Sequence, residues 1–343
     1  MKIYIFSEIN YNDNKHINQY LFDYLTEKKD DCYFVERVTM KFPKLRHFIS
    51  LFKKNKAVNI DKEKNKIIKC RILPPLRVFK LLNYFLLRKA NLILNESDII
   101  ISFVPHSHVY NIAGNKAKKI YYCVHDSQKQ NYPINVIPYE KKLANRSIFF
   151  CDNETVMKNI TTNYYLSYDE RREKYISDYK AFLVPPPVPD EFFKIDKNQE
   201  IKYNFVYYGS FHSHIDIGLI EQLSERYTIL IISNNPPSDL KKNNNITVLE
   251  SIYDMEKLAN KINSAENILL PYDNSYFMST ITPAKALQVK SFGKGVYCSN
   301  TCISKKYKFS TQLKELNPIE RITQDYSVSN ICDFLYNIIK SER

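Results

Sequence analysis

The order of apolar and polar positions divides the chain into two α/β halves. In the first half, short apolar runs typical of buried strands alternate with segments whose apolar residues recur every three or four positions, as on one face of a helix. Strands are expected at residues 2–7, 32–38, 98–104, 119–124 and 147–151, and helices at 16–28, 75–94 and 138–144. Strand–helix–strand units at this spacing require a parallel sheet covered by helices.

A proline-rich run, LVPPPVP at residues 183–189, interrupts this pattern. Proline lacks a backbone donor and holds the chain extended, so neither a helix nor a sheet continues through it easily. The alternation then restarts, with strands expected at 203–208, 228–233, 246–249 and 268–270 and helices ending at 225 and spanning 254–262, 283–292 and 328–339. We predict domains at 1–183 and 201–325 that face a cleft, joined by a linker at 184–200 and followed by a C-terminal helix at 326–343.

Length and composition fit this two-domain interpretation. The 343 residues suffice for two cores, and 44% hydrophobic with 25% charged residues is the balance of a soluble globular protein. Seven scattered cysteines without a CxxC pair indicate a reduced, cytoplasmic chain. The first residues lack the features of a signal peptide, and no apolar run approaches the ~18 residues of a membrane span. We therefore expect a protein that neither crosses a membrane nor is exported.

The positive charge is concentrated in one segment. Residues 41–90 hold 15 Lys and Arg against two acidic residues, which accounts for the whole net charge of +13. From 41 to 56, apolar residues recur at helical spacing among cations, which is typical of an amphipathic helix on an anionic membrane surface. The residues expected to face the membrane include Phe42, Lys44, Phe48, Lys53 and Lys54. The alternative is a helix that packs its apolar stripe on its own domain. Nucleic acid is disfavoured, because no nucleic-acid-binding motif accompanies the charge.

Two segments of the second half carry candidate binding chemistry. Gly209 and Ser210 follow the apolar strand FVYY, where a glycine lets a ligand approach the backbone closely, although a plain tight turn is the alternative. Further on, Thr282 can cap a helix with Pro283 at its first position. The N–H groups of such a helix start bind phosphate, and Lys285 in its first turn makes more sense beside an anion. The alternative is a capped helix with a solvated lysine.

The sequence around that helix resembles a known family. The order Pro283-Ala-Lys285-Ala-Leu-Gln288, then Ser291-Phe-Gly293-Lys-Gly295-Val296, resembles the P-x-K-x-x-E-y-l-A-x-G-k-P-V segment of bacterial GT-B glycosyltransferases. The likeness is closer to the branch of xanthan glucuronosyltransferase and teichuronic acid enzymes. Further segments agree in order and spacing: PPLRVFKLLNYFL (74–86), KIYYCVHD (119–126), EKKLANRSIFFCDNETVMKNI (140–160) and AFLVPPPVPDEFF (181–193). The resemblance implies two Rossmann-like domains and a final helix that can cross back to the first.

The resemblance also implies a donor site. It assigns the donor diphosphate to Ser279, Thr280, Ile281, Thr282, Pro283 and Lys285, with Gly209 and Ser210 nearby. Gln288 stands where the family has a Glu that bonds the ribose, and Tyr253 where the base is stacked. Retaining members carry two Glu eight positions apart, and the absence of that pair here favours inversion. The donor would be a UDP- or GDP-sugar, with no obligatory cofactor or metal ion.

Asp126 is the candidate catalytic base. It follows a strand at the carboxyl end, where parallel sheets expose reactive residues, and an inverting transfer needs one carboxylate to take the acceptor's proton. An Asp that caps the next turn is the alternative. The candidates for the acceptor side are Glu8, Asn12, His106 and His125, although the histidines also suit structural roles.

Together these features predict a hexosyltransferase of surface polysaccharide synthesis, such as capsule or lipopolysaccharide. Its acceptor would be a glycan, commonly linked to a polyprenyl diphosphate, at the cytoplasmic face of the cell membrane. Two alternatives remain at this point. One is a UDP-sugar epimerase of the same fold, and the other is a non-catalytic basic α/β protein on a membrane or nucleic acid.

Overall fold

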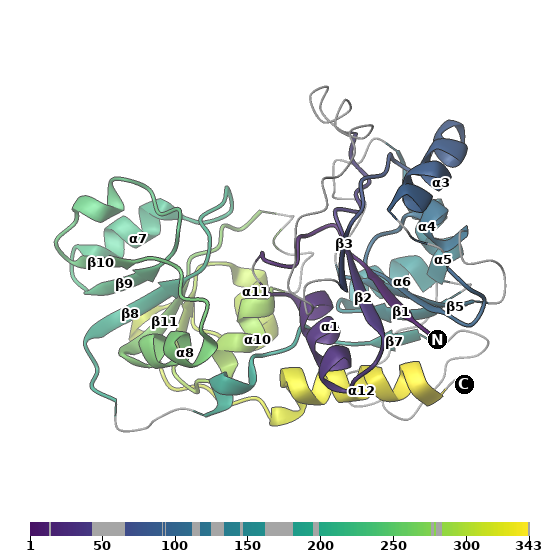
Figure 1. The fold of residues 1–343 in the computed structure, drawn as a ribbon. Helices are drawn as coiled ribbons and strands as arrows, with labels where there is room; N and C mark the ends of the chain where they lie inside the picture. The colour runs from purple at the N-terminus through teal and green to yellow at the C-terminus, as the bar shows by residue number, and fades with distance from the viewer. Residues whose placement is uncertain are drawn as a thin grey trace. The chain divides into compact units, whose positions relative to one another are not determined.

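A computed structural model of the protein describes residues 1–13, 15–42, 66–90, 92, 94–111, 117–124, 134–144, 147–161, 181–194, 199–275, 278 and 283–341. The chain forms two compact units, one of Met1–Pro185 with Cys332–Arg343 and the other of Pro186–Ile331. Each unit holds a parallel sheet covered by helices (Figure 1). The sequence prediction had placed the end of the first domain at residue 183, at the start of the same proline run.

The first unit is built on a seven-stranded sheet in the order β3-β2-β1-β4-β5-β6-β7, with every neighbouring pair parallel. Every residue of β1, β4 and β6 is buried, which is why these strands are apolar runs in the sequence, apart from Ser102 at the end of β4. The strands are β1 (Ile3–Phe6), β2 (Cys32–Glu36), β3 (Ile67–Lys69), β4 (Ile99–Ser102), β5 (Lys118–Cys123), β6 (Ile148–Cys151) and β7 (Ala181–Leu183). The helices are α1 (Ile17–Glu27), α3 (Lys80–Lys89), α4 (Ser107–Asn111), α5 (Ile137–Ala144) and α6 (Glu154–Thr161).

The second unit is built on a five-stranded parallel sheet in the order β10-β9-β8-β11-β12. Its strands are β8 (Tyr203–Tyr208), β9 (Ile229–Ile232), β10 (Ile246–Leu249), β11 (Ala265–Leu270) and β12 (Gly295–Cys298). Its helices are α7 (Ile217–Ser224), α8 (Met255–Asn263), α10 (Ala284–Lys290) and α11 (Thr301–Tyr307). Asp216, Asp254 and Asn300 each accept a hydrogen bond from the N–H three residues on and so cap α7, α8 and α11.

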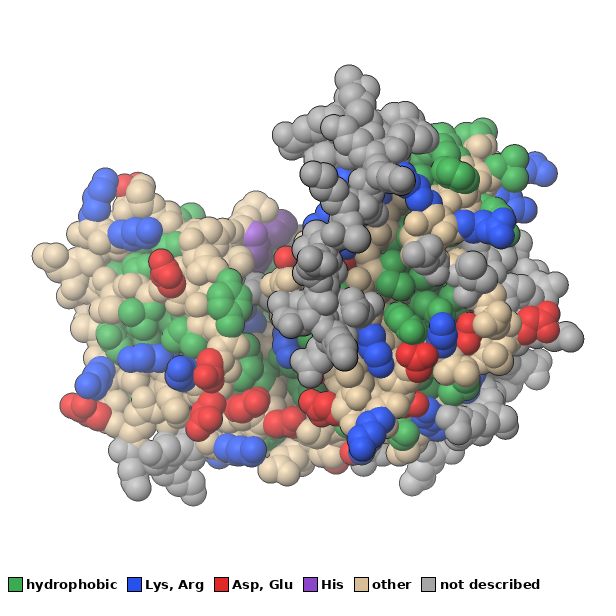
Figure 2. All heavy atoms as spheres, in the orientation of Figure 1, with side chains coloured by type: hydrophobic (Ala, Val, Ile, Leu, Met, Phe, Trp, Pro, Cys, Tyr) green, Lys and Arg blue, Asp and Glu red, His purple; other side chains and the backbone are tan. Residues whose placement is uncertain are grey.

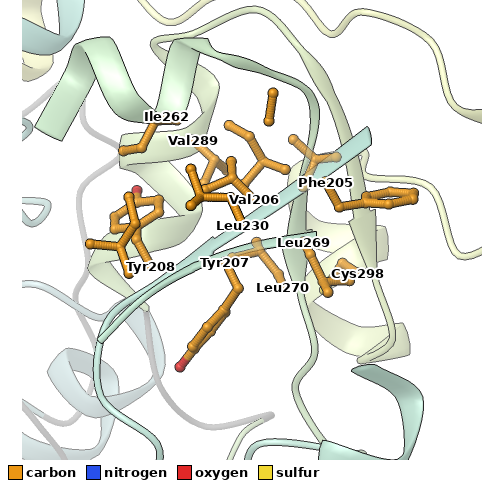
Figure 3. Close-up of a cluster of buried hydrophobic side chains, with 14 of the residues drawn as sticks. Phe205, Val206, Tyr207, Tyr208, Leu230, Ile262, Leu269, Leu270, Val289 and Cys298 are labelled. Carbon is orange, nitrogen blue, oxygen red and sulfur yellow. The ribbon is translucent and has the colours of Figure 1, made fainter. Parts of the chain in front are cut away.

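The core of the second unit lies between its sheet and its helices. Figure 3 shows Val206 and Leu230 of the sheet gathered with Ile262 of α8 and Val289 of α10. These side chains are fully or almost fully buried. The packing therefore fixes the position of α10 against the carboxyl half of β8.

The last helix, α12 (Val328–Ser341), carries the chain back to the first unit. Its final turns contact that unit through Lys118 Nζ, which donates to the Ile339 carbonyl at 2.8 Å, and through an ion pair between Lys340 and Asp30. Before the helix, Val188 pairs with Ser327 in a parallel bridge, so the outgoing and returning segments of the chain are hydrogen-bonded. The predicted crossing of the C-terminal helix is confirmed.

The sequence prediction missed several short elements. Strands β3, β7 and β12 have three or four residues, too few to show a period, and they form because a neighbouring strand pairs with them. The helices α4, α6 and α11, of five to eight residues, were also missed. Strand β11 begins three residues before the predicted range of 268–270.

The helix predicted at 75–94 is shorter in the structure. A 3-10 turn, η2 (Arg77–Phe79), leads into α3 at Lys80. The buried Asn83 side chain explains the difference, because its Oδ1 accepts from the Leu73 N–H and its Nδ2 donates to the Leu73 carbonyl, both at 2.8 Å. These bonds hold the preceding segment extended alongside the helix.

No helix among the described residues is long and apolar enough to cross a bilayer. Of the basic helix predicted at 41–56, the structure describes Lys41 and Phe42. The other residues predicted to face a membrane, Lys44, Phe48, Lys53 and Lys54, lie outside the described residues.

Candidate functional site

The topology of the second sheet indicates that ligands bind at the carboxyl ends of its central strands. Strand β8 pairs with both β9 and β11, and the connection from β8 leads to β9 while the connection from β11 leads to β12 on the other side. In open α/β sheets, ligands bind outside the carboxyl ends of strands where the connections diverge in this way. Gly209 follows β8 at this point, and residues 271–275 follow β11.

Gly209 has a conformation and a neighbour that both require glycine. Its φ is +118°, and its N–H donates to the Ile232 carbonyl at 2.9 Å. A Cβ at this position would lie 2.0 Å from Nζ of Lys285 and 2.6 Å from its Cε. The exposed Ser210 follows, and its carbonyl accepts from the Tyr207 hydroxyl at 2.8 Å. The backbone after β8 is therefore shaped around the end of a lysine side chain.

Lys285 projects from the first turn of α10 into this position. Its ammonium lies over the rings of Tyr207 and Tyr208, 4.9 and 5.5 Å from their centroids. Figure 3 shows these two rings pointing in different directions from adjacent positions of β8. No carboxylate among the described residues forms an ion pair with Lys285, and burial lowers its pKa to about 8. Among the described residues, aromatic rings are the groups that offset this partly buried cation, and such a position favours an anionic ligand.

The start of α10 differs by one residue from the prediction. Pro283 was expected at the first helical position, but its ψ of 122° leaves it extended, and the helix begins at Ala284. Pro283 thus occupies the N-cap position, without a side-chain cap. Ser279, Thr280, Ile281 and Thr282 lie outside the described residues, so the predicted cap by Thr282 stays a prediction.

Two other predicted donor residues lie around the same edge of the sheet. The Tyr208 hydroxyl donates to Oε1 of Gln288 at 3.3 Å, which orients the Gln288 amide. Tyr253 is 64% exposed, and its hydroxyl accepts from Asn234 Nδ2 at 2.8 Å. Asn234 in turn accepts from the Ser251 N–H at 2.8 Å. The hydroxyl of Tyr253 is therefore held in place while most of the residue stays exposed.

The sequence prediction missed a polar cluster beside Lys285. His214 Nδ1 pairs with Asp273 Oδ2 at 3.0 Å and lies 3.2 Å from the Ser275 hydroxyl. The hydrogen bond from Ser275 lowers the pKa of Asp273, and burial together with the charge of Lys285 lowers the pKa of His212. The signal was the HSH triplet directly after the Gly209 turn and the PYDNS segment directly after β11.

The residues predicted for the acceptor side differ in how far they are exposed. Glu8 is partly buried after β1 and accepts from the Thr39 hydroxyl at 3.0 Å, whereas Asn12 is exposed. The His106 side chain is fully buried, and its Nε2 donates to the Leu73 carbonyl at 2.9 Å. Burial lowers the pKa of His106 to about 3, so the ring is neutral and holds the segment beside α3 in place.

Asp126 and His125 lie outside the described residues. The structure describes the strand before them, β5, which ends at Cys123 between β4 and β6. Within the described ranges, no group of three His, Cys, Asp or Glu side chains is placed to hold a metal ion.

Comparison with known proteins identifies the fold. No protein-family model and no curated protein sequence matches the chain. Among solved structures, TarM is similar at 10% identity and a TM-score of 0.52 over 99% of this chain and 92% of that one. WaaG, a glycosyltransferase involved in lipopolysaccharide biosynthesis, is similar at 8% identity and a TM-score of 0.50 over 100% and 91%. The chain has the two-domain GT-B fold, as its sequence predicted.

Proposed function

We propose that this protein is a glycosyltransferase that takes a sugar from a nucleotide-sugar donor bound to its second unit. The observation that carries the proposal is the ammonium of Lys285, which lies against the backbone of Gly209 without a carboxylate partner among the described residues. A diphosphate at this edge would supply the missing charge and approach the backbone where no Cβ intervenes. Gln288 would bond the ribose, and the exposed Tyr253 ring would stack on the base.

The chemistry assigned to these groups is an inverting transfer. The acceptor hydroxyl oxygen attacks the anomeric carbon, the bond from that carbon to the phosphate oxygen breaks, and Asp126 takes the hydroxyl proton. The electron pair leaves on the diphosphate, where the positive charge of Lys285 stabilises it. The acceptor we propose is a polyprenyl-linked glycan of surface polysaccharide synthesis, reached at the cytoplasmic face of the membrane. The sequence resemblance to the xanthan and teichuronic acid branch supports this choice of acceptor.

Two measurements test the proposal. UDP or GDP should raise the melting temperature of the protein, and a protein that responds to neither nucleotide is not a nucleotide-sugar enzyme. Free nucleoside diphosphate should then appear only when both the donor and a lipid-linked glycan acceptor are present. Release that needs no acceptor, with epimerised sugar as product, would support the epimerase alternative instead.

Asp126→Asn tests the assignment of the base. The amide cannot accept the proton, so turnover should fall about 100-fold, the lower part of the range for general-base catalysis. The melting-temperature shift caused by the nucleotide should stay unchanged, because Asp126 belongs to the first unit. Asp152→Asn, which follows the neighbouring strand β6, is the matched control. Full turnover of the Asp126 variant would assign the base to another residue.

The lowered pKa of Lys285 predicts an unusual pH dependence. The diphosphate binds the protonated ammonium, so affinity should be constant near pH 7 and fall up to tenfold per pH unit above about pH 8. Unfolding raises this pKa towards about 10.4, so the unfolded chain binds more protons between these values and the ligand-free protein gains stability as pH rises. Calorimetric titration with UDP between about pH 7 and 9.5 measures the first effect. A flat affinity profile would exclude Lys285 as the phosphate-binding cation.

A further inference from the structure

One surface of the first unit carries apolar side chains in place of polar ones. Ten large hydrophobic side chains of the described residues are exposed. Four of them lie close together in the sequence, between positions 78 and 85 of η2 and α3. Val78, Leu81, Tyr84 and Phe85 are 79%, 83%, 49% and 58% exposed. Figure 2 shows hydrophobic side chains gathered over α3, with Lys and Arg side chains around them. We call Val78, Leu81, Tyr84 and Phe85, with the adjacent cations, the α3 surface.

The exposed positions follow the period of a helix. Residues 77 and 78, 80 and 81, 84 and 85, and 88 and 89 are exposed, whereas 83, 86 and 87 are buried. One face of the helix therefore packs on its own unit through Asn83, Leu86 and Leu87. A second apolar face is exposed to solvent. Packing among the described residues of the first unit does not explain the second face.

The outward face is also basic. Arg77, Lys80, Arg88 and Lys89 are exposed around the apolar side chains, and the sequence has no Asp or Glu between residues 64 and 95. The Arg88 guanidinium lies 5.5 Å from the centroid of the Tyr84 ring, so cations and apolar groups lie at the same level of the surface. Phe42, which the sequence predicted to face a membrane, is 51% exposed and contacts Phe79 edge-on, with ring centroids 6.1 Å apart.

These observations select one occupant. A second copy of this chain, packed on itself through the α3 surface, would bring like charges together. A nucleic acid would neutralise the cations but leave Leu81 and Phe85 without an apolar partner. An anionic bilayer accommodates both kinds of side chain, because the apolar ones enter the boundary of the acyl chains while the cations contact the headgroups. We propose that the α3 surface docks the protein on an anionic lipid bilayer. The inference rests on the proposed function only for its purpose, which is access to a lipid-linked acceptor.

Vesicle sedimentation with the full-length protein tests the proposal. The protein should bind vesicles of phosphatidylcholine with phosphatidylglycerol and bind pure phosphatidylcholine about tenfold more weakly. Leu81→Ser with Phe85→Ser should weaken binding to the anionic vesicles about tenfold or more. Arg88→Gln with Lys89→Gln should weaken it about tenfold at low salt and make little difference on neutral vesicles.

The second unit offers matched controls. Ile201→Ser with Ile217→Ser removes two apolar side chains that are also exposed, and Lys305→Gln with Lys306→Gln removes two adjacent helical cations. Both control pairs should bind vesicles like the unmodified protein. Equal binding by the α3 variants and the controls would overturn the proposal, as would α3 variants that lose only binding to duplex DNA or only self-association.

The same variants separate this inference from the proposed function. UDP or GDP should stabilise the α3 variants as much as the unmodified protein, because the donor site lies in the other unit. Loss of vesicle binding with an intact nucleotide response supports the docking surface. Vesicle binding through α3 in a protein that no nucleotide stabilises would refute the glycosyltransferase and leave the docking surface standing.

Discussion

Lys285→Met is expected to lower kcat/KM about a thousandfold and, at the same time, to raise the melting temperature of the ligand-free protein. The first effect follows because the variant removes the cation that would hold the diphosphate in the ground state and stabilise it as it leaves. The second follows because the ammonium is partly buried against two tyrosine rings without an ion-pair partner among the described residues. The gain in the free energy of unfolding should be about 1 kcal/mol.

The opposite signs distinguish a binding group from a structural one. A lysine that stabilised the fold would lower both stability and activity when removed. Lys290→Met, at the last position of the same helix, is the control and should change neither quantity appreciably. Steady-state kinetics of the two variants give the change in kcat/KM, and thermal unfolding without ligand gives the change in stability. A Lys285→Met protein that UDP or GDP still stabilises fully would show that the diphosphate binds elsewhere.

Gly209→Ala is expected to reduce kcat/KM by a similar factor, through geometry instead of charge. The new Cβ would lie 2.0 Å from Nζ of Lys285, so the ammonium must leave its place, and a φ of +118° strains any other residue. The strain should also lower the free energy of unfolding by about 2 kcal/mol. Nucleotide affinity is therefore to be measured well below the melting temperature of the variant.

Two comparisons isolate the collision. Gly218→Ala places its Cβ 3.6 Å from the nearest atom, Asp216 Oδ1, within α7, and should be neutral or slightly stabilising. In a Lys285→Ala background, Gly209→Ala should cost only the backbone strain and no further nucleotide affinity, because the colliding atoms are gone. Additive losses of affinity in the double variant would mean that Gly209 and Lys285 act at separate places.

The sequence predicted the elements with strong local patterns and missed those that depend on neighbours. The runs IYIF, III and FVYY are apolar throughout because both faces of their sheets are covered, and each lies in a strand where expected. The strand of Ile67–Lys69 is half exposed and exists because β2 pairs with it. Its three residues could not be told from a loop without knowledge of that partner.

In the candidate site, too, the sequence predicted single residues from their local context but not the contacts that the fold brings about. Gly209 and Lys285 were predicted from their places after a strand and at a helix start, yet nothing in the spacing of residues 76 positions apart showed that their atoms would meet. The pairing of His214 with Asp273 joins two loops that come together only because β8 and β11 are neighbours. The outward apolar face of α3 was missed for another reason, since the sequence alone does not show which of the helix's apolar side chains its own unit buries.

The return of α12 to the first unit has a consequence for biosynthesis. A nascent chain emerges from the amino terminus, and N-terminal domains generally begin to fold before later ones are made. Here the contacts of Lys118 with Ile339 and of Asp30 with Lys340 join residues translated before the second unit to residues translated after it. The first unit therefore cannot form its contacts with α12 until the whole second unit has been translated. A chain truncated before residue 332 would contain the whole second unit but lack these contacts of the first unit.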